Sequence, residues 1–334
     1  YLADSGTNTN RKYRYTAMAV LRDDTPILLH THFSNTVVQW LIENKKLPDY
    51  EDFRIVKAEA TAGRNRFDFI LEKDGKPFFL EVKSCTQFGK RIAMFPDAVT
   101  ARGRRHITEL AHYAEKGTPG GILFLIHWPR ADYFLPDYHT DPEFARTLIH
   151  YRNKLLITAV SIGWMNNLTL KNDIRKVEIP WRVATEESRD SGSYMLILKL
   201  RENMAIDIGK LGTVDFRKGF YIYVGSAKKN LQKRLERHLR KRKNMFWHID
   251  YLRDKAEDCT AIPIRSTDDL ECGLSKAIDR ITPFSIPGFG SSDCDCGSHL
   301  FYAGDNPLKN SFFIDTLLHF RMDRLHKRLM TQNP

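Results

Sequence analysis

The sequence is poor in cysteine and has no long hydrophobic run. Its 334 residues include only five cysteines, an odd number that does not fit the disulfide framework of a small secreted domain. The stretch GILFLIHW, residues 121–128, is among the longest apolar runs, and a membrane-spanning helix needs about 20 such residues. The start resembles no signal peptide, although Tyr1 in place of methionine indicates that the chain begins inside a longer product. We therefore expect a cytoplasmic protein with no membrane partner.

Acidic residues are outnumbered by basic ones, and the excess is concentrated in one segment. The 52 Lys and Arg residues exceed the 41 Asp and Glu residues by 11. Residues 228–243, KKNLQKRLERHLRKRK, contain nine of these cations and one Glu, which gives a local charge of +8. Such a segment favours a polyanion as partner, and nucleic acid above all. The alternative is an ordinary solvated helix face.

The order of the segments predicts a mixed α/β fold for the first part of the chain. Residues 33–48, FSNTVVQWLIENKKLP, carry apolar residues at helical spacing, with Ser34 or Asn35 as the N-terminal cap and Pro48 beyond the end. Strands are expected at 13–21, 27–32, 53–60, 66–71, 78–85, 121–128 and 155–162, and further helices at 100–116 and 141–153. A helix, a meander and then alternating elements predict an α/β sandwich.

A polar segment divides the chain, as its length leads us to expect of a two-domain protein. Residues 182–191, RVATEESRDS, are nearly free of large apolar side chains, and we assign a linker there. Beyond it we expect strands at 192–200 and 219–225, then the basic helix, then helices at 246–256, 268–281 and 311–329. The predicted parts are 1–33, an N-terminal β segment; 34–181, the first domain; 192–303, the second domain; and 304–334, a C-terminal basic helix.

A predicted hairpin in the first domain sets charges opposite each other. If Asp74-Gly75 is a two-residue type I′ turn, residues whose numbers add to 149 face each other across the two strands. Asp68 is then opposite Glu81, and Lys83 is opposite Arg66 on the same face. The other face receives only apolar side chains, namely Phe67, Phe69, Leu71, Phe78, Leu80 and Val82.

The opposed carboxylates suggest a metal site. Two carboxylates roughly 5 Å apart across a strand pair destabilise the sheet by up to about 1 kcal/mol, and a shared divalent cation would remove the repulsion. Mg²⁺, or Mn²⁺ in its place, takes one or two carboxylates together with phosphate oxygens and water. Lys83 would then be placed to assist an attacking water or to stabilise phosphoryl charge. A solvated face with mixed charges explains the same pattern equally well.

The spacing of Asp68 and Glu81-Val82-Lys83 resembles the D…ExK signature of PD-(D/E)XK nucleases. The flanking sequences NRKYRYTAMAV, AGRNRFDFIL, FFLEVKSCT and MFPDAVTARGRRHITEL are similar to the sugar fermentation stimulation protein (SfsA) family over roughly residues 1–180. This resemblance implies a PD-(D/E)XK, restriction-endonuclease-like core that follows a partial OB-like segment at 1–33. It also implies DNA binding, and cleavage of DNA or RNA, with Asp68, Glu81 and Lys83 at the catalytic positions.

The same resemblance adds further site residues. It implies that Glu59 is an auxiliary metal-binding acid. It also places the segment Phe95-Pro96-Asp97-Ala98 along the site with Arg102 and His106, and we count Arg66 among the expected nucleic-acid contacts. The alternatives are a helix N-terminal cap for Asp97 and a solvated helix charge for Arg102.

The second domain resembles the GIY-YIG nuclease superfamily. Gly192-Ser193-Tyr194 stands in the place of GIY, and Tyr223-Val224-Gly225 stands in the place of YIG. The resemblance covers residues 190–303, includes WHIDYL, ECGLSKAI and IPGFGSSDCDCGSHLFY, and implies a small α+β domain. It implies a site made of Tyr194, Tyr223, Arg234 and the metal-binding Glu271. The alternatives are packing for the tyrosines, and a charge at a helix N-terminus for Glu271.

The basic segment is the predicted nucleic-acid contact of this domain. Leu231, Leu235 and Leu239 form the stripe expected to be buried, with Arg234 and His238 beside it. Trp247, Tyr251, Phe246 and Tyr223 add aromatic surface for stacking on bases. The residues expected to contact nucleic acid are Lys228, Lys229, Lys233, Arg237, His238, Arg240, Lys241, Arg242 and Lys243.

A cysteine and histidine cluster near the end of the second domain is a candidate zinc site. Cys294, Cys296 and His299 could be completed by Cys272, Cys259 or His248. The spacing differs from the usual C-x2-C, so free thiols are the favoured alternative.

The sequence therefore predicts a DNA-binding protein and a Mg²⁺- or Mn²⁺-dependent nuclease of the SfsA type. In this hypothesis Asp68 and Glu81 hold the metal, while the second domain grips DNA, or RNA. One alternative is a non-catalytic DNA-binding transcriptional regulator that keeps a relict site. Another is an RNA-processing adaptor that only recognises structure.

Overall fold

The computed structural model describes residues 1–4, 13–62 and 65–332. The chain separates into two compact units, Tyr1–Ala184 and Thr185–Pro334. Across the described part of the chain, no helix combines the length and the hydrophobicity that crossing a membrane requires.

The first unit is built on a six-stranded mixed sheet in the order β13-β12-β10-β7-β6-β5. The first three strands along the chain form an antiparallel meander, and the next two run parallel to the last strand of that meander. The strands are β5 (Arg54–Ala62), β6 (Asn65–Lys73), β7 (Lys76–Cys85), β10 (Gly120–Ile126), β12 (Leu156–Ser161) and β13 (Arg175–Val177). The predicted strands between 53 and 162 are thus confirmed, with small shifts at their ends.

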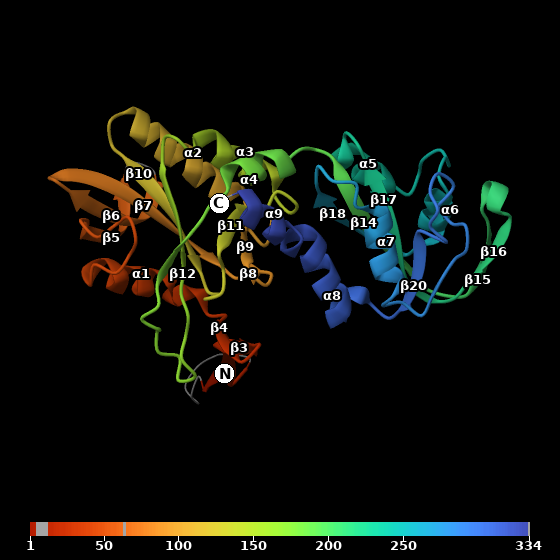
Figure 1. The fold of residues 1–334 in the computed structure, drawn as a ribbon, viewed down its shortest axis with the longest axis horizontal. Helices are drawn as coiled ribbons and strands as arrows, with labels where there is room; N and C mark the ends of the chain where they lie inside the picture. Colours follow the sequence, from red (N-terminus) through yellow and green to blue (C-terminus); the bar gives the residue numbers. More distant parts are fainter. Residues whose placement is uncertain (5–12, 63–64, 333–334) are drawn as a thin grey trace. The chain divides into compact units, whose positions relative to one another are not determined.

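Helices cover both faces of this sheet (Figure 1). Helix α1 (Ser34–Glu43) packs Val38 and Leu41 against the face that carries Leu80. Helices α2 (Ala101–Glu115) and α3 (Pro142–Tyr151) pack their apolar residues against the face that carries Phe79. The expected α/β sandwich is therefore confirmed, and the central strands are apolar on both faces because both are covered.

Short strands complete the first unit. A three-stranded sheet has the order β11-β9-β8, and two hairpin-like pairs lie near the N-terminus. Their bounds are β1 (Leu2–Asp4), β2 (Tyr15–Ala17), β3 (Ala19–Arg22), β4 (Thr25–Leu28), β8 (Gln87–Phe88), β9 (Ile92–Phe95) and β11 (Tyr133–Pro136). The strand expected at 13–21 is thus divided into β2 and β3, and the strand expected at 27–32 ends at Leu28.

The β6–β7 hairpin has the predicted turn and register. Asp74 and Gly75 both have positive φ, 51° and 74°, as a type I′ turn requires. The paired residues run from Lys73 with Lys76 to Phe69 with Leu80, so their numbers add to 149 as expected.

The predicted separation of faces on this hairpin is wrong in one respect. Phe67 was expected beside Phe69, but its ring stacks on that of Phe79 at a centroid distance of 4.9 Å, on the opposite face. The regular pairing of β6 skips Asp68 on both sides, and Glu59 on β5 has φ of 50°. Alternation does not hold through such an irregular position. The face of Glu81 is also covered by α2, and is not a solvated face.

The second unit is built on an antiparallel five-stranded sheet in the order β18-β14-β17-β20-β19. The first two expected strands, at 192–200 and 219–225, are confirmed as β14 and β17. The strands are β14 (Gly192–Leu200), β17 (Gly219–Ala227), β18 (Asp258–Arg265), β19 (Phe284–Ser285) and β20 (Leu300–Gly304), with a separate hairpin of β15 (Met204–Asp207) and β16 (Thr213–Phe216).

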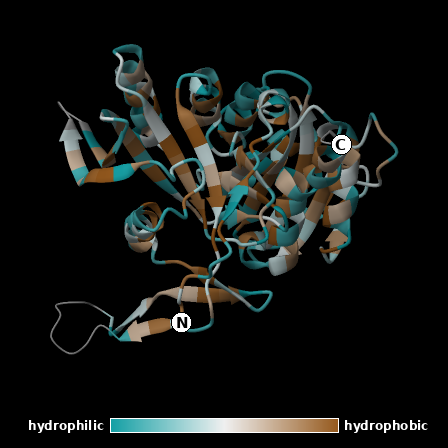
Figure 2. Cartoon of the chain, turned by 60° about the vertical axis from the view of Figure 1, so that its left-hand side comes forward, coloured by the Kyte–Doolittle hydropathy of each residue, from teal (hydrophilic) through white to brown (hydrophobic). Residues whose placement is uncertain are grey.

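Helices also cover both faces of the second sheet. Helices α5 (Leu231–Leu239) and α6 (His248–Lys255) pack against the face of Leu196 and Tyr223, while α7 (Glu271–Asp279) and α8 (Ser311–Leu318) pack against the face of Val224. Figure 2 shows the resulting pattern, with hydrophobic residues concentrated along the strands and hydrophilic residues frequent on the helices.

The expected linker and C-terminal helix both differ from the structure. Residues 182–187 belong to helix α4 (Trp181–Glu187), in which Val183 and Ala184 are buried. Glu187 is fully buried and pairs with Arg324 and Arg328. The C-terminal segment is α8, a π-helical turn η4 (His319–Asp323) and α9 (Leu325–Gln332), and it packs on the second unit through Phe313. Its cations Arg321, Arg324 and Arg328 contact Pro263, Glu187 and other groups of the second unit, so it is not a separate basic helix.

Candidate functional site

In the first unit, Glu81 on β7 is the centre of a buried charged cluster. Its side chain is only 5% exposed, and the Nζ atom of Lys83 lies 2.5 Å from its Oε1. The same oxygen contacts Nδ1 of His106 on α2. The Nε atom of Arg102 donates to Nε2 of His106 at 3.3 Å, which leaves the histidine proton on Nδ1, facing Glu81. The structure therefore brings four sequence-predicted residues together.

This cluster keeps Glu81 ionised. Burial alone would raise its pKa, but the hydrogen bond from His106 and the charge of Lys83 outweigh burial and lower the pKa below its usual value. An anionic, half-neutralised carboxylate with a lysine beside it suits a site that handles a further cation or a phosphate.

Asp68 on β6 is held differently, by neutral donors. Its Oδ2 accepts a 2.8 Å hydrogen bond from the backbone N–H of Val82, and its Oδ1 accepts one of 2.9 Å from Asn35 on α1. Burial and the nearby charge of Glu81 raise its pKa above the usual value, against the lowering effects of these bonds and of Lys83. The charges of Asp68 and Glu81 therefore interact, but the regular pairing of the hairpin ends at Phe69 and Leu80, so the predicted pairing of Asp68 directly opposite Glu81 is not seen.

Sequence reasoning missed the role of Asn35. Either Ser34 or Asn35 was expected to cap α1, and this is wrong, because the N-cap is Phe33 and makes no side-chain cap bond. A short 3-10 turn, η1 (Thr31–Phe33), leads into the helix instead. Both polar side chains are thereby free for contacts with the sheet: Asn35 binds Asp68, and Oγ of Ser34 lies 3.4 Å from Nε2 of His127.

Two carboxylates on neighbouring strands are suitable ligands for a hard divalent cation. Each oxygen of Asp68 accepts one N–H and keeps further acceptor capacity, and the contacts of Glu81 with Lys83 and His106 both go to Oε1. The set is rich in carboxylate oxygen and lacks sulfur, which favours Mg²⁺ or Mn²⁺ over soft metals. The residues present therefore fit the expected metal.

Other expected residues of the first unit lie apart from this cluster. Glu59 and Arg66 are exposed, and their side chains pair with each other at 2.5 Å. Among the contacts of the described residues, none joins Glu59 to Asp68 or Glu81. Asp97 is exposed, and Thr100 caps α2 through a bond from Gly103, so the alternative of Asp97 as the helix cap is wrong.

In the second unit, the residues of the expected GIY-YIG-like site line one pocket. This pocket has a volume of about 250 Å³. It is lined by side chains from two strands and two helices, namely Tyr194, Tyr223, Arg234 and Glu271. Residues not assigned to the site from the sequence also line it, namely Ser226, Phe246, Trp247, His248, Gly290, Ser292 and Asp293.

Polar contacts fix the side chains around this pocket. The hydroxyl of Tyr194 lies 2.9 Å from Nε2 of His238, Nη1 of Arg234 donates to the carbonyl of Ser226 at 2.8 Å, and the Ser226 hydroxyl donates to Oε2 of Glu271. Burial raises the pKa of Tyr194 and of Tyr223 well above the usual value, so both phenols are protonated near neutral pH. They can donate hydrogen bonds to a bound anion.

The glycine of the second motif has a packing role. Gly225 pairs with Tyr194 across the β14–β17 ladder, and a Cβ atom at Gly225 would lie 2.5 Å from the Tyr194 ring. Glycine is needed there because the ring passes directly over the backbone. The motif therefore sets the position of Tyr194 in the pocket.

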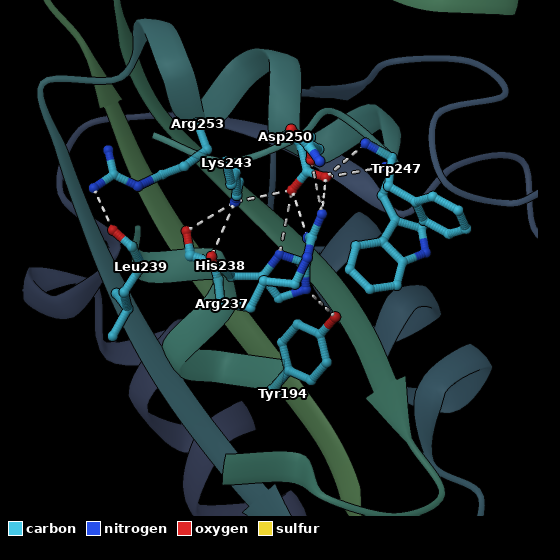
Figure 3. Close-up of polar contacts among 10 residues, drawn as sticks. Tyr194, Arg237, His238, Leu239, Lys243, Trp247, Asp250 and Arg253 are labelled. Atoms are coloured by element: carbon cyan, nitrogen blue, oxygen red, sulfur yellow. Dashed lines mark hydrogen bonds and ion pairs between the residues drawn. The ribbon is translucent and has the colours of Figure 1, made fainter. Parts of the chain in front are cut away.

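Three residues of the basic segment, Arg237, His238 and Lys243, surround Asp250 of α6, as Figure 3 shows. Asp250 is fully buried. It accepts bonds from Arg237 at 2.9 Å and from the backbone of Phe246 and Trp247, and Nζ of Lys243 lies 2.9 Å from it. These contacts and that of His238 outweigh burial and hold its pKa far below the usual value.

Several predictions for the basic segment are therefore wrong. Helix α5 ends at Leu239, so residues 240–243 are not helical, and Leu239 is 40% exposed and not buried. The side chains of His238 and Lys243 are 1% and 6% exposed, and Arg237 is bound to Asp250, so these three are structural residues. The expected contacts that remain exposed are Lys228, Lys229, Lys233, Arg240, Lys241 and Arg242. The sequence signal that could have indicated this contact is that Asp250 is the first acidic residue after the cationic run.

The structure also completes the expected cysteine and histidine cluster. Among the described residues, Cys272 joins Cys294, Cys296 and His299, and one ligand atom from each lies within 4.8 Å of all the others. Cys259 is buried in β18 and is outside this group. His248 lines the pocket instead.

Comparisons with known proteins match both units. Residues 32–165 match the family described as sugar fermentation stimulation protein RE domain, and residues 193–321 match a domain of unknown function, DUF123. A sugar fermentation stimulation protein homolog from Methanothermobacter thermautotrophicus is 33% identical over 174 residues, covering 52% of this chain and 72% of the relative. A homolog from Methanosphaera stadtmanae is 38% identical over 167 residues, covering 49% of this chain and 67% of the relative.

A solved structure of Pyrococcus furiosus SfsA in complex with Ca²⁺ matches at a TM-score of 0.47 and 26% identity, covering 51% of this chain and 74% of that one.

Proposed function

This chain belongs to the sugar fermentation stimulation protein (SfsA) family and carries a C-terminal DUF123 domain, and on that premise we propose that it is a metal-dependent nuclease. The resemblance of the first part of the chain to the SfsA family is thereby confirmed, and the second part matches DUF123. The observation that carries the proposal is the cluster of Asp68, Glu81 and Lys83 on the β6–β7 hairpin with His106 of α2. In this interpretation the first unit is a PD-(D/E)XK core preceded by a partial OB-like segment.

Each residue of the cluster has a role in phosphodiester hydrolysis. Asp68 and Glu81 would hold Mg²⁺ or Mn²⁺, which would polarise the phosphate and supply a nucleophilic water. Lys83 stabilises negative charge that develops on the phosphoryl group. His106 and Arg102 orient Glu81 through the contacts described above, and Asn35 orients Asp68.

The second unit supports a second contact with nucleic acid. Its pocket combines Arg234, two protonated tyrosines and Glu271, a set that can bind a phosphate and, through the carboxylate, a divalent cation. Six exposed cations of the basic segment add attraction for a nucleic-acid backbone. The proposed role of this GIY-YIG-like unit is to bind DNA, or RNA, with a second cutting site as the stronger form of the hypothesis.

A cleavage assay with the full chain tests the proposal. Plasmid, single-stranded DNA and RNA are incubated with wild type, Glu81→Gln, Glu271→Gln and the double variant, in Mg²⁺, Mn²⁺ or EDTA. We expect wild-type cleavage that EDTA abolishes. Glu81→Gln should reduce it at least ~100-fold, because a charge that binds the metal is removed, while DNA binding in a gel-shift assay is retained.

Glu43→Gln is a matched control, because Glu43 is an exposed acid of α1 whose contact is with Gln39. It should cleave like wild type. If wild type binds nucleic acid but cuts no substrate with either metal, the nuclease proposal fails and the non-catalytic DNA-binding regulator remains. If Glu271→Gln alone abolishes cleavage, the cutting site belongs to the second unit.

A further inference from the structure

Four metal-binding side chains converge beside the pocket of the second unit. Cys272 lies on α7, while Cys294, Cys296 and His299 lie on the segment between β19 and β20. Their ligand atoms all lie within 4.8 Å of one another, and Sγ of Cys294 is 3.4 Å from Nε2 of His299. Neighbouring ligand atoms of a tetrahedral site with Zn–S bonds near 2.3 Å are expected about 3.8 Å apart. The four atoms are therefore already close to that arrangement.

The chemistry of the four ligands favours zinc. Three thiolates and one imidazole select a soft or borderline cation, and Cys3His is a common composition of closed structural zinc sites. The group contains no carboxylate ligand and is therefore unlike the Mg²⁺-type site around Asp68. Four protein ligands also fill a tetrahedron, so such a metal would hold structure and would not catalyse.

The segment that supplies three of the ligands gives a zinc ion a structural role. Residues 286–299 form no helix or strand, and a connection of this length is unusual within a compact domain. The backbone bonds from Gly288 to Gly297 and from His299 to Phe289 bring its two limbs together. A metal bound by Cys294, Cys296 and Cys272 of α7 would fix the rest of the segment to that helix, which also carries Glu271.

His299 connects this cluster to the pocket. With Nε2 directed at the cysteines, its buried Nδ1 lies 3.3 Å from Oε1 of Glu271. Coordination of Nε2 places the ring proton on Nδ1, which then faces the carboxylate. A metal-bound histidine that donates its other N–H to a carboxylate is a recurrent arrangement in zinc proteins.

We propose that Cys272, Cys294, Cys296 and His299 bind one structural Zn²⁺ and that Glu271 is the outer partner that orients His299. The zinc fixes residues 286–299 against α7 and holds Glu271 at the edge of the pocket. This inference does not depend on nuclease activity.

Metal analysis of the full chain tests the site. Protein purified without added metal should contain about one zinc ion per chain by mass spectrometry, and X-ray absorption at the zinc edge should show three sulfur neighbours and one nitrogen neighbour. Cys272→Ser and Cys294→Ser should each lose the zinc. Cys259→Ser is the matched control, because this buried thiol lies outside the cluster, and it should keep the metal.

Competition with a chelator tests the link to Glu271. Glu271→Gln should still bind zinc, with affinity about 10-fold weaker, as expected when the carboxylate partner of a metal-bound histidine is altered. Ser226→Ala also changes a contact of Glu271 but leaves His299 untouched, so its zinc affinity should be that of wild type.

Two results would overturn the proposal. One is wild-type protein that contains no zinc and binds none when it is added; disulfides among these cysteines would then be sought by mass spectrometry. The other is an absorption spectrum that shows zinc held by other ligands, a measurement that needs no variant to fold. Equal zinc affinity in Glu271→Gln and wild type would refute the role of Glu271.

Discussion

The two units bury their carboxylates in contrasting ways. Asp250 in the second unit accepts bonds from a guanidinium and two backbone N–H groups, and an ammonium lies 2.9 Å away, so its charge is neutralised and its pKa is held low. Asp68 in the first unit receives hydrogen bonds from two neutral donors among the described residues, and burial together with the nearby charge of Glu81 raises its pKa. The charge of Asp250 is neutralised by the protein's own cations, and the charge of Asp68 would be neutralised by a bound metal cation.

This difference separates structural from functional charge. A fully paired buried carboxylate is needed by the fold, because removing it leaves its buried partners unpaired. Its charge is already neutralised, so it has little attraction for a further ligand. A buried carboxylate that lacks a cationic partner of its own costs stability, and strain of this kind is concentrated at functional sites. The basic segment illustrates the same distinction. Its Arg237 and Lys243 pair with the buried Asp250, while the exposed cations of the segment remain available to a partner.

The largest effect on stability is expected at Asp250. Asp250→Ala leaves Arg237 and the buried Lys243 without their carboxylate and should lower the free energy of unfolding by roughly 3–5 kcal/mol, measured by urea denaturation. Glu257→Ala is the matched control, since Glu257 pairs with Lys199 and Arg201 at a partly exposed position, and should cost far less. Similar decreases for the two variants would show that Asp250 is not an essential anchor.

Metal binding should give the opposite result at Asp68. At 100 times its Kd, Mg²⁺ should stabilise wild type by about 2.7 kcal/mol, seen as a higher Tm. Asp68→Asn should lose this gain while its stability without metal stays near that of wild type or rises, because a repulsion with Glu81 is removed. Asp52→Asn, at an exposed acid paired with Lys73, should respond like wild type. An equal Mg²⁺ response in Asp68→Asn would show that the metal binds elsewhere.

Local rules predicted the hairpin of the first site, while the residues of the second site came from a family resemblance. The turn chemistry of Asp74-Gly75 was enough to give the register of β6 and β7 from Lys73 with Lys76 to Phe69 with Leu80. Tyr194 was assigned through the resemblance to the GIY-YIG superfamily, and the structure supplies a steric reason for the motif, because a Cβ atom at Gly225 would lie 2.5 Å from the Tyr194 ring. Such features follow from steric limits that act within a few residues or across one strand pair.

The features that sequence reasoning missed depend on tertiary contacts. Nothing near Asn35 indicates that it binds Asp68, 33 positions later in the chain. The charge of residues 228–243 predicted an exposed helix, but Asp250 draws two of its cations inward and α5 ends early. Phe67 changed face because Asp68 interrupts the regular pairing. In the first two cases a partner distant in the sequence decides the contact, and in the third an irregular strand position breaks the alternation.

A buried histidine extends the comparison to pH. Burial lowers the pKa of His127 in the first unit to about 4, and hydroxyls are its hydrogen-bond partners. Since the unfolded histidine has a pKa near 6.5, the stability that it contributes is complete above that value and is lost as pH falls toward 4. Between pH 7 and 5 the decrease should be about 2 kcal/mol.

A variant that cannot titrate isolates this effect. In His127→Gln the free energy of unfolding should fall less steeply between pH 7 and 5 than in wild type, by the amount just given, whatever its stability at pH 7. Denaturant titrations at several pH values supply the measurement. Parallel curves for the two proteins would mean that His127 binds protons equally in the folded and unfolded states, and a wild-type curve that falls less steeply than that of the variant would mean that His127 is protonated in the fold.

The smallest effect per residue is expected when the exposed cations of the basic segment are neutralised. The effect on DNA affinity shows which of the two units contacts the phosphates. Neutralising Arg240, Lys241 and Arg242 to glutamine should reduce the slope of log affinity against log salt by about 0.9 for each phosphate that is no longer neutralised, measured by fluorescence anisotropy with duplex DNA. The matched control neutralises Lys45, Lys76 and Lys116, three exposed lysines of the first unit. It should leave the slope unchanged, because the second unit is the one proposed to contact the phosphates of the DNA.

A slope that falls equally in both triple variants would mean that the net charge of the protein, and not the basic segment, governs binding.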